Sequence, residues 1–416
     1  MPSLRNRYWK AAVLLVAAGV CGCNGASDAS ERGARQLTEL TGELRPAVDS
    51  NNQLAWSLYG ASQKEPGNLF FSPFSISLAL GMTYAGARGT TADELAQLLA
   101  VDDAAMYHQG LGALGRDLSG RHGGRAYQLY TACRLFGAAN QEWSPDYLDL
   151  LDHDYASPLE PLDFGADPES ARQTINSWVA GQTQDKVPEL LHAGDIDGST
   201  VFALTSAIYF DAAWATKFNP GSTAGAPFTL ADGSMVNVPQ MSITAKLNIA
   251  QDSELTLVEL DYASHELSML LLIPQAVDGL AAVEANLNQP HIDALLAGAS
   301  EQETLLALPR LELHVELPLT EAVQSLGVHA LFDSASADLS GMLATGGPGD
   351  LWVSVTRHQA YLKVDERGTE AAAATAVVGT KHAGASFISA NHPFAFAIRD
   401  KLTSTLLFVG RIVDPR

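Results

Sequence analysis

Histidines, cysteines and carboxylates build most catalytic and metal sites, and this chain contains many of them without a catalytic pattern. Its 416 residues include 11 His, 3 Cys and 47 Asp and Glu. The histidines are scattered, and no two stand at the spacing of a metal-binding pair on a helix. The sequence has no G-x-S-x-G, H-E-x-x-H or Walker A pattern. We therefore predict no enzyme activity, no cofactor and no metal site.

One glycine pattern is compatible with a nucleotide site. Residues 110–115 read GLGALG and match G-x-G-x-x-G. The preceding residues 104–109 do not favour the strand that a dinucleotide-binding turn requires. We expect a loop around a helix end instead.

The most unusual segment is 364–376, which reads VDERGTEAAAATA. Ala371–Ala374 favour a helix by intrinsic propensity. They nevertheless follow Gly368 and run into Val377 and Val378, which favour a loop or a strand. Because its side chains are small, such a segment is easily inserted between existing strands.

Composition and charge describe an acidic protein with a substantial core. The net charge is −22, the pI is about 4.7 and 47% of residues are hydrophobic. Since no basic surface dominates, we predict no nucleic-acid partner. We find no second linker and no internal repeat after residue 48, and we expect a monomer.

Residues 1–22 have the pattern of an export signal. Arg5, Arg7 and Lys10 precede the short apolar run 11–20. Val20-Cys21-Gly22-Cys23 resembles a bacterial lipobox, which predicts cleavage after Gly22 and lipidation of Cys23. The alternative is an ordinary secretory signal with two incidental cysteines.

These observations predict the domain organisation and the location. We expect a signal peptide over 1–22, a lipidated N-terminus and flexible tether over 23–48, and a single domain over 49–416. We expect the protein to be exported, either as an outer-membrane lipoprotein or as a periplasmic or extracellular protein. Cys133 is the one cysteine left in the folded part, and we expect it to be a small buried residue.

The elements around the unusual segment are a mixture of helices and strands. Helix signals are Asp49-Ser50, Ser72-Pro73, a capping box at 91–94, and the run 170–180. Strand candidates are 200–209, 255–260, 267–273, 305–313, 352–364 and 406–413. Helices dominate the first half and strands the second, so we predict an α+β fold with large sheets.

Several segments together resemble the serpin family, in the family's order from about residue 49 to 415. They are Asn68–Ser77, Gly86–Leu95, Asn176–Val179, Ala207–Trp214, Leu326–Phe332, Ala337–Gly341, Asn391–Phe396 and Phe408–Arg411. The resemblance implies the serpin fold, with helices packed on large mixed and antiparallel β-sheets and an exposed reactive loop. It places Ser72 and Ser75 under the centre of the main sheet.

The resemblance also implies a function and a partner. A serine protease, with cysteine proteases as a second class, attacks a bond in the reactive loop and forms an acyl-enzyme. The freed hinge then inserts into the main sheet and traps the protease. The alternative is a non-inhibitory serpin-fold binding or chaperone module.

The resemblance assigns a hinge with residues suited to insertion. Alternate side chains of an inserted strand turn inward, and one set contains only small or hydroxyl side chains, while Glu370 falls in the outward set. No proline interrupts 368–391. We expect Arg367 to be exposed. The hinge residues are Glu366, Gly368, Thr369, Glu370, Ala371, Ala372, Ala373, Ala374 and Thr375.

Family spacing from Gly368 places the reactive bond at His382-Ala383. The alternative bond Lys381-His382 suits a trypsin-like protease, and cleavage after Val378 would suit an elastase-like one. One position departs from the family. Ser206 replaces the usual Asn that contacts a histidine, here His358, so we expect this contact in the sheet-opening region to be lost or bridged by water.

Overall fold

The computed structural model describes residues 25–120, 127–354, 356–369 and 386–416. The chain divides into two compact units, Met1–Gly42 and Glu43–Arg416. Helix α1 (Gly25–Ser62) begins in the first unit. The second unit contains the rest of α1 and both β-sheets, and it is the unit that carries the hinge.

Helix α1 differs from the sequence prediction at its N-terminus. It begins at Gly25, within the predicted tether, and not at Asp49. Asp49 lies inside the helix, where its Oδ1 accepts a hydrogen bond from Nε of Arg45 (2.8 Å), one turn earlier. Leu44 and Val48 are buried. The packed unit therefore extends N-terminal of residue 49.

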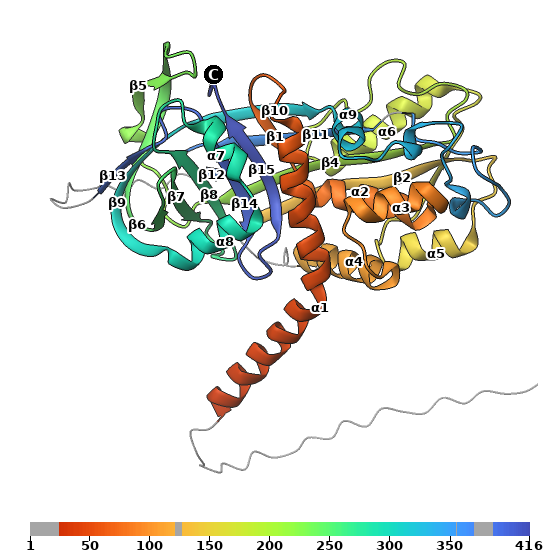
Figure 1. Cartoon of the computed structure of the whole chain (residues 1–416), viewed down its shortest axis with the longest axis horizontal. Helices are drawn as coiled ribbons and strands as arrows, with labels where there is room; N and C mark the ends of the chain where they lie inside the picture. Colours follow the sequence, from red (N-terminus) through yellow and green to blue (C-terminus); the bar gives the residue numbers. More distant parts are fainter. Residues whose placement is uncertain (1–24, 121–126, 355, 370–385) are drawn as a thin grey trace, which may run out of the picture. The chain divides into compact units, whose positions relative to one another are not determined.

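A six-stranded sheet runs through the centre of the second unit (Figure 1). Its strands, in spatial order, are β10 (Leu311–Leu317), β11 (Arg357–Val364), β12 (Gly368–Thr369), β4 (Phe202–Ala213), β2 (Tyr127–Ala138) and β3 (Glu160–Leu162). Strands β11 and β4 pair in parallel, whereas β10 pairs with β11 and β2 with β4 in antiparallel fashion.

A nine-stranded sheet forms the second layer of strands. Its path is β1 (Leu69–Phe71), β15 (Leu406–Ile412), β14 (Phe394–Asp400), β8 (Leu267–Pro274), β7 (Leu255–Asp261), β6 (Met235–Gln251), β9 (Ser300–Pro309) and β13 (Ser386–Ser389), and β5 (Ala224–Thr229) pairs with β6. Every residue of β8 is buried, which confirms the prediction of a strand covered on both faces.

Helices pack against both sheets. They are α2 (Pro73–Gly86), α3 (Gly89–Leu98), α4 (Ala104–Gly120), α5 (Pro145–His153), α6 (Pro168–Gln182), α7 (Leu280–Asn286), α8 (Gln289–Gly298) and α9 (Leu319–Ser325), with short 3-10 turns η1 (Pro220–Ser222), η2 (Ala330–Phe332) and η3 (Ser340–Met342). The α+β architecture with large sheets that the sequence predicts is confirmed.

Alternation along the strands separates the faces that α2 and α6 cover. Ala132 and Ala207 belong to the core that packs under α6. Their neighbours Cys133 and Ser206 face the other way and contact Ser75 of α2. Helices α2 and α6 therefore lie on opposite faces of the sheet (Figure 1).

The start of α2 follows the predicted capping pattern. The hydroxyl of Ser72 accepts a hydrogen bond from the backbone N–H of Ser75 (3.1 Å), and Pro73 occupies the first helical position. Almost the whole helix is buried, so its N-terminus lies fixed beneath the sheet.

Two local predictions were wrong because tertiary contacts use the residues differently. Thr91 and Glu94 do not form a capping box, since both lie inside α3. Glu94 instead accepts hydrogen bonds from the backbone of His329 and Ala330 (both 2.8 Å). The glycine motif at 110–115 lies within α4 and not in a loop. A Cβ on Gly112 would come within 1.8 Å of the carbonyl oxygen of Asp154, so this glycine serves close packing.

Two strand predictions also need correction. The segment 305–313 is not one strand, because β9 ends at Pro309 and β10 begins at Leu311 in the other sheet. The strand expected from Trp352 begins at Arg357. Both errors arise because a continuous apolar pattern does not reveal where a strand begins or where the chain changes sheets.

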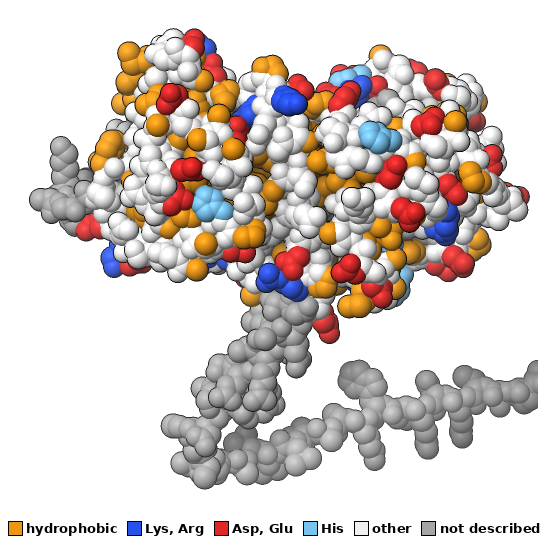
Figure 2. All heavy atoms as spheres, in the orientation of Figure 1, with side chains coloured by type: hydrophobic (Ala, Val, Ile, Leu, Met, Phe, Trp, Pro, Cys, Tyr) orange, Lys and Arg blue, Asp and Glu red, His pale blue; other side chains and the backbone are white. Residues whose placement is uncertain are grey.

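The surface of the described region agrees with the acidic composition. Figure 2 shows carboxylate side chains spread over the visible face, with Lys and Arg occurring singly or in small groups. Among the described residues, no helix has the length and apolar character needed to cross a membrane. The same residues contain no group of three or more potential metal ligands.

Candidate functional site

The hinge enters the six-stranded sheet where β11 and β4 separate. These two strands are paired from Arg357 and Thr205 as far as Tyr361 and Tyr209. Beyond this point β12 lies between them, and it is antiparallel to both. Gly368 and Thr369 of the hinge thus already occupy the position of an additional central strand.

Gly368 fits this position because it lacks a side chain. A Cβ there would lie 2.0 Å from the carbonyl oxygen of Ala212 and 2.5 Å from Cα of Ala213. Its φ of +156° is also outside the range that most residues prefer. Any larger residue would push β12 away from β4.

Thr369 faces inward, as the sequence predicted for its parity. Its side chain is fully buried, and its hydroxyl is 2.9 Å from that of Tyr262. The ring of Tyr262 stacks on Trp214 with centroids 4.6 Å apart. The inward face at this point is therefore a tight aromatic environment with one hydroxyl partner, and it accepts a small polar side chain.

Glu366 anchors the turn between β11 and β12. Its side chain is 6% exposed and accepts hydrogen bonds from Nε (2.9 Å) and Nη2 (2.5 Å) of Arg310, and from the hydroxyl of Thr223. Burial would raise the pKa of Glu366, but the bonds from Arg310 and Thr223 outweigh burial and lower it. The backbone of Phe218 donates to the Glu366 carbonyl (2.9 Å). Glu366 is therefore held as a carboxylate.

The next hinge residue lies on the outside of the same turn. Arg367 is exposed, as predicted, while its carbonyl oxygen accepts a hydrogen bond from the backbone of Trp214 (2.9 Å). The indole nitrogen of Trp214 donates to the carbonyl of Asp365 (3.0 Å). The turn is thus fixed to β4 through its backbone.

The paired part of β11 and β4 is joined by a buried hydrogen-bond network. Nδ1 of His358 lies 2.9 Å from the hydroxyl of Ser206, which is 2.9 Å from the hydroxyl of Ser75. Nε2 of His358 accepts a hydrogen bond from the backbone N–H of Ser72 (3.0 Å). Since a backbone N–H can only donate, the neutral imidazole carries its proton on Nδ1.

This direct contact corrects the expectation that a serine would be too short to reach His358. Ser206 and His358 are opposite each other in the parallel register, so the strands themselves bring the hydroxyl to Nδ1. Burial lowers the pKa of His358 from 6.5 to about 3. The imidazole is therefore neutral at neutral pH and holds β11, β4 and α2 together.

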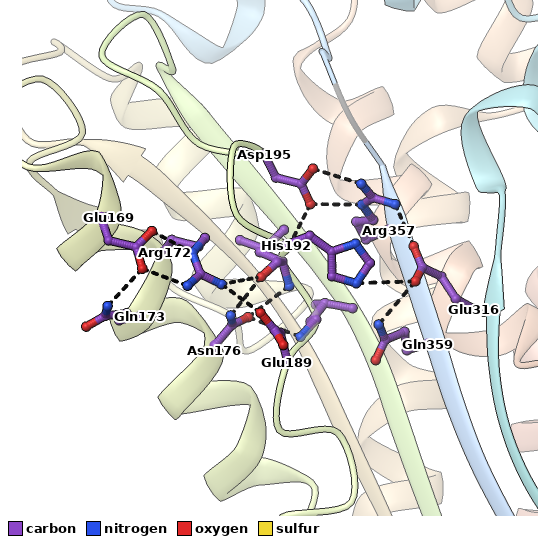
Figure 3. Close-up of polar contacts among 12 residues, drawn as sticks. Glu169, Arg172, Gln173, Asn176, Glu189, His192, Asp195, Glu316, Arg357 and Gln359 are labelled. Atoms are coloured by element: carbon purple, nitrogen blue, oxygen red, sulfur yellow. Dashed lines mark hydrogen bonds and ion pairs between the residues drawn. The ribbon is translucent and has the colours of Figure 1, made fainter.

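On the opposite face, the connection from α6 to β4 is tied to β11 (Figure 3). Asp195 of this connection accepts hydrogen bonds from Nε (2.9 Å) and Nη2 (2.8 Å) of Arg357, the first residue of β11. Nη1 of Arg357 donates to Glu316 of β10 (2.5 Å), and His192 lies 3.4 Å from the same carboxylate. The Asp195–Arg357 pair thus links the chain leading into β4 to the strand on the other side of the insertion position.

The same connection is fixed to α6 (Figure 3). The side chain of Asn176 accepts from the backbone of Leu190 and Leu191 and donates to the Leu191 carbonyl, at 2.8–3.1 Å. Arg172 also donates to the Leu191 carbonyl (2.7 Å). Sequence reasoning singled out Asn176 but missed Asp195 and Arg357, because residues 162 positions apart give no local signal of their contact.

The hinge start and the sheet-opening residues lie along the same two strands, β11 and β4, and the remaining predicted positions lie outside the described residues. These are Cys23 and Glu370, Ala371, Ala372, Ala373, Ala374, Thr375, Lys381, His382 and Ala383. Cys133, expected to be buried, is partly exposed as a residue, but its thiol points inward to the carbonyl of Ser75 (3.8 Å), and burial raises its pKa.

Comparison with known proteins identifies the class of protein that this fold and hinge define. Residues 49–415 match the family described as Serpin (serine protease inhibitor), and the chain belongs to this family. Human leukocyte elastase inhibitor is 36% identical over 378 residues, covering 88% of this chain and 98% of that protein. Mouse antithrombin-III is 32% identical over 404 residues, covering 92% and 86% respectively.

Solved structures give the same result for the fold. Uncleaved ovalbumin superposes with a TM-score of 0.80 at 27% identity, covering 88% of this chain and 99% of that chain. Human thyroxine-binding globulin, solved with its hormone, has a TM-score of 0.80 at 25% identity, with coverages of 90% and 99%. The serpin resemblance seen in the sequence is thereby confirmed.

Proposed function

We propose that this serpin inhibits serine proteases as a suicide substrate, with cysteine proteases as a second target class. Its relatives include antithrombin-III and several leukocyte elastase inhibitors. The observation that carries the proposal is the position of Gly368 and Thr369, already paired between β11 and β4. The role of the chain in the reaction is that of a substrate that traps the protease, and not of a catalyst.

The existing register predicts where the rest of the hinge goes after cleavage. Thr369 is opposite Val364 of β11 and Ala212 of β4. Continuing both antiparallel registers places Thr375 opposite His358 and Ser206, which are opposite each other now. Residues 369–376 then match the eight residues of β11.

This register also explains why every residue of the hinge that would face inward is small. Thr369 faces inward, so Ala371, Ala373 and Thr375 follow on the same face. The hydroxyl of Thr375 would enter between Nδ1 of His358 and Oγ of Ser206, whose present bond must open. A hydroxyl can accept from the imidazole and donate to Ser206, so the buried network stays satisfied.

Insertion is favourable because it replaces one short ladder with two longer ones. Five residue pairs join β11 and β4 in parallel. A strand between them would pair antiparallel with both neighbours over about eight residues each, and antiparallel pairing is slightly the more stable. At about 1 kcal/mol for each net hydrogen bond, the gain is several kcal/mol. The uncleaved chain is then held by a kinetic barrier.

The reactive bond that we propose is His382-Ala383, with Lys381-His382 as the alternative. It would be attacked by the protease nucleophile to give an acyl-enzyme, and insertion of residues 370–376 would carry the acylated protease away before deacylation. The alternative function is a non-inhibitory serpin-fold binding or chaperone module.

Incubation with trypsin-like, elastase-like and subtilisin-like proteases tests this proposal. We expect loss of protease activity together with a protein–protease adduct that survives denaturation, and a new C-terminal peptide that begins at Ala383 or His382. Cleavage within 370–385 by every protease, with full protease activity and no adduct, would favour the non-inhibitory alternative.

We also propose that the chain is an exported bacterial lipoprotein, anchored through Cys23 after removal of residues 1–22. The support is the Val20-Cys21-Gly22-Cys23 sequence after a short apolar run. An outer-membrane or extracellular inhibitor of this kind would meet proteases outside the cell as a monomer. Metabolic labelling with a fatty-acid analogue should mark the wild type and not Cys23→Ser, and labelling of neither would contradict the anchor.

A further inference from the structure

A row of four ring side chains crosses the six-stranded sheet on the face where α6 lies. Neighbours in the row are directly opposite each other in the strand register, and their ring centroids are 5.6, 6.1 and 4.6 Å apart. The row consists of Tyr130 of β2, Tyr209 of β4, Tyr361 of β11 and His314 of β10. Tyr209 has the same parity along β4 as Ala207, which belongs to the core under α6.

The middle of this row coincides with the point where β11 and β4 separate. Tyr361 and Tyr209 are the last pair of the parallel ladder between the two strands. Both residues are buried, at 3% and 4% exposure. Continuing the two registers of β12 places Ala372 opposite both of them. An inserting hinge must therefore part these two rings before it can advance towards Ser206 and His358.

Lys186, in the connection from α6 to β4, lies over both of these rings. Its Nζ is 5.1 Å from the centroid of the Tyr361 ring and 6.0 Å from that of Tyr209. Both distances are within the range of about 6 Å in which a cation is attracted to an aromatic face. Lys186 is only partly exposed, which strengthens such contacts because water competes less for the charge. One ammonium group thus contacts β11 and β4 at the same time.

The backbone before Lys186 is strained, and it is fixed on both sides. Gln184 and Asp185 have positive φ angles of 52° and 58°, which are uncommon for residues with a side chain. The backbone N–H of Lys186 donates to the Thr183 carbonyl (3.0 Å), and that of Val187 donates to the Thr183 hydroxyl (3.2 Å). Val187 is 2% exposed and packs in the core under α6. Strain that is maintained in this way is typical of positions with a functional role.

Insertion cannot preserve both contacts of the ammonium group. A new strand increases the separation of β11 and β4 by one strand spacing, so ring centroids that are now 6.1 Å apart would be roughly 11 Å apart. A cation within about 6 Å of both rings would then have to lie almost on the line between them. Ala372 of the inserted strand would occupy that place. At least one of the two contacts must therefore break.

We propose that Lys186 is a positioning residue that controls the rate of hinge insertion, because its ammonium holds Tyr361 and Tyr209 together across the insertion position. The inference rests on the proposed inhibitory function. The contact acts after the acyl-enzyme has formed, so it changes the speed of insertion and not the speed of cleavage. In the uncleaved chain the same contact adds to the kinetic barrier against premature insertion.

The test compares full-length wild type with Lys186→Met, Lys186→Gln and Lys186→Arg. The first two variants remove the charge on side chains of different length, and the third retains a cation. Each protein is mixed with an excess of the trypsin-like, elastase-like or subtilisin-like protease that cleaves it fastest. Quenched flow times acylation, and stopped-flow tryptophan fluorescence times insertion, since Trp214 is hydrogen-bonded to the hinge turn.

A matched control breaks a similar contact of α6 away from the insertion position. The guanidinium of Arg134, on β2, lies 4.7 Å from the ring centroid of Trp178, on α6. β2 is on the other side of β4 from β11. Arg134→Met therefore loosens α6 without removing any contact between β11 and β4.

We expect Lys186→Met and Lys186→Gln to speed insertion after acylation by about fivefold, the factor that corresponds to one lost cation–π contact. Lys186→Arg should stay within about twofold of the wild type, because a guanidinium also binds aromatic faces. Arg134→Met should stay within the same limit. The acylation rate should be equal in all variants.

A double-mutant cycle tests whether the lysine acts across the insertion position. In Tyr361→Leu the remaining contact of Lys186, with Tyr209, lies on one side of that position only. Adding Lys186→Met to Tyr361→Leu should therefore change the insertion rate by less than about twofold. A fivefold acceleration in this background would show that Lys186 does not act by bridging the two rings, and would overturn the proposal.

Two other results would also overturn it. Insertion at the wild-type rate in both uncharged variants, even with a lower melting temperature before cleavage, would leave Lys186 with a structural role only. Equal acceleration by Arg134→Met would assign the effect to a loosened α6.

Failure of this inference is distinguishable from failure of the proposed function. Normal trapping of the protease, with insertion rates that do not depend on Lys186, would refute the inference alone. Cleaved wild type that neither traps protease nor gains melting temperature would refute both.

Discussion

Replacing Ala371 with Arg should convert the inhibitor into a substrate. The register of the inserted strand places residue 371 inward, opposite Leu362 of β11 and Phe210 of β4. Both side chains are 1% exposed or less. Insertion of Ala371→Arg would therefore bury a guanidinium between apolar side chains with no carboxylate assigned to it.

The size of the effect follows from the cost of burying that charge. A penalty of about 3 kcal/mol, at the low end for an ion in a protein interior, lowers the equilibrium constant for insertion roughly 100-fold and slows insertion by part of that factor. Deacylation of the protease then competes successfully with trapping, and most encounters end in cleavage and release. We expect the amount of inhibitor consumed per trapped protease to rise at least about tenfold, because only part of the penalty is felt at the transition state.

The assay titrates a fixed amount of protease with increasing inhibitor and measures residual activity and adduct. Glu370→Arg is the matched control, since it introduces the same side chain one residue earlier on the outward face. Its neighbours in the inserted strand would be Lys363 and Asp211, both partly exposed. The reasoning is refuted if Ala371→Arg titrates like the wild type, or if Glu370→Arg is equally impaired.

Further predictions concern the contacts that hold β11 and β4 together and fix the turn before β12. Ser206→Ala should lower the free energy of unfolding by about 1 kcal/mol, measured by urea denaturation, because it removes the hydroxyl partner of His358; an unchanged midpoint would contradict this. Asp195→Asn should lower that free energy by about 1–2 kcal/mol, because a charge-assisted pair with Arg357 is lost. The same variant should insert its loop faster, as monitored by the rise in melting temperature, and slower insertion would show that the Asp195–Arg357 pair does not hold the strands together. Glu366→Gln should weaken the β11–β12 turn and increase amide exchange there, while protection equal to the wild type would show that the carboxylate is dispensable. The neutral form of His358 stabilises the fold above pH 6.5, and this contribution is lost as pH falls from 6.5 towards 3; between these values the slope of stability with pH should exceed that of His358→Gln by up to about 1.4 kcal/mol per pH unit, and equal slopes would refute the assignment.

The sequence predicted the family fold well where local chemistry decides the structure. Ser72-Pro73 starts α2 as expected, and the uniformly apolar run from Leu267 becomes the buried strand β8. Thr369 faces inward as its alternation indicated. In each case the side chains themselves contain the information.

The sequence failed where a distant backbone competes for the same side chain. Glu94 had the spacing of a capping residue but binds the backbone near His329, 235 residues away. Ser206 was expected to lose contact with His358, yet the register of two parallel strands brings them to 2.9 Å. Asp195 had no sequence signal at all, because its role depends on where the α6–β4 connection meets β11.

The central claim is that the hinge becomes a strand between β11 and β4, in the register that Gly368 and Thr369 have now. A structure of the protein after cleavage within 370–385 tests it most directly. The account predicts Thr375 between His358 and Ser206, with its hydroxyl within hydrogen-bond distance of both side chains. A cleaved protein in which His358 and Ser206 remain opposite each other, with β11 and β4 still paired in parallel, would contradict it.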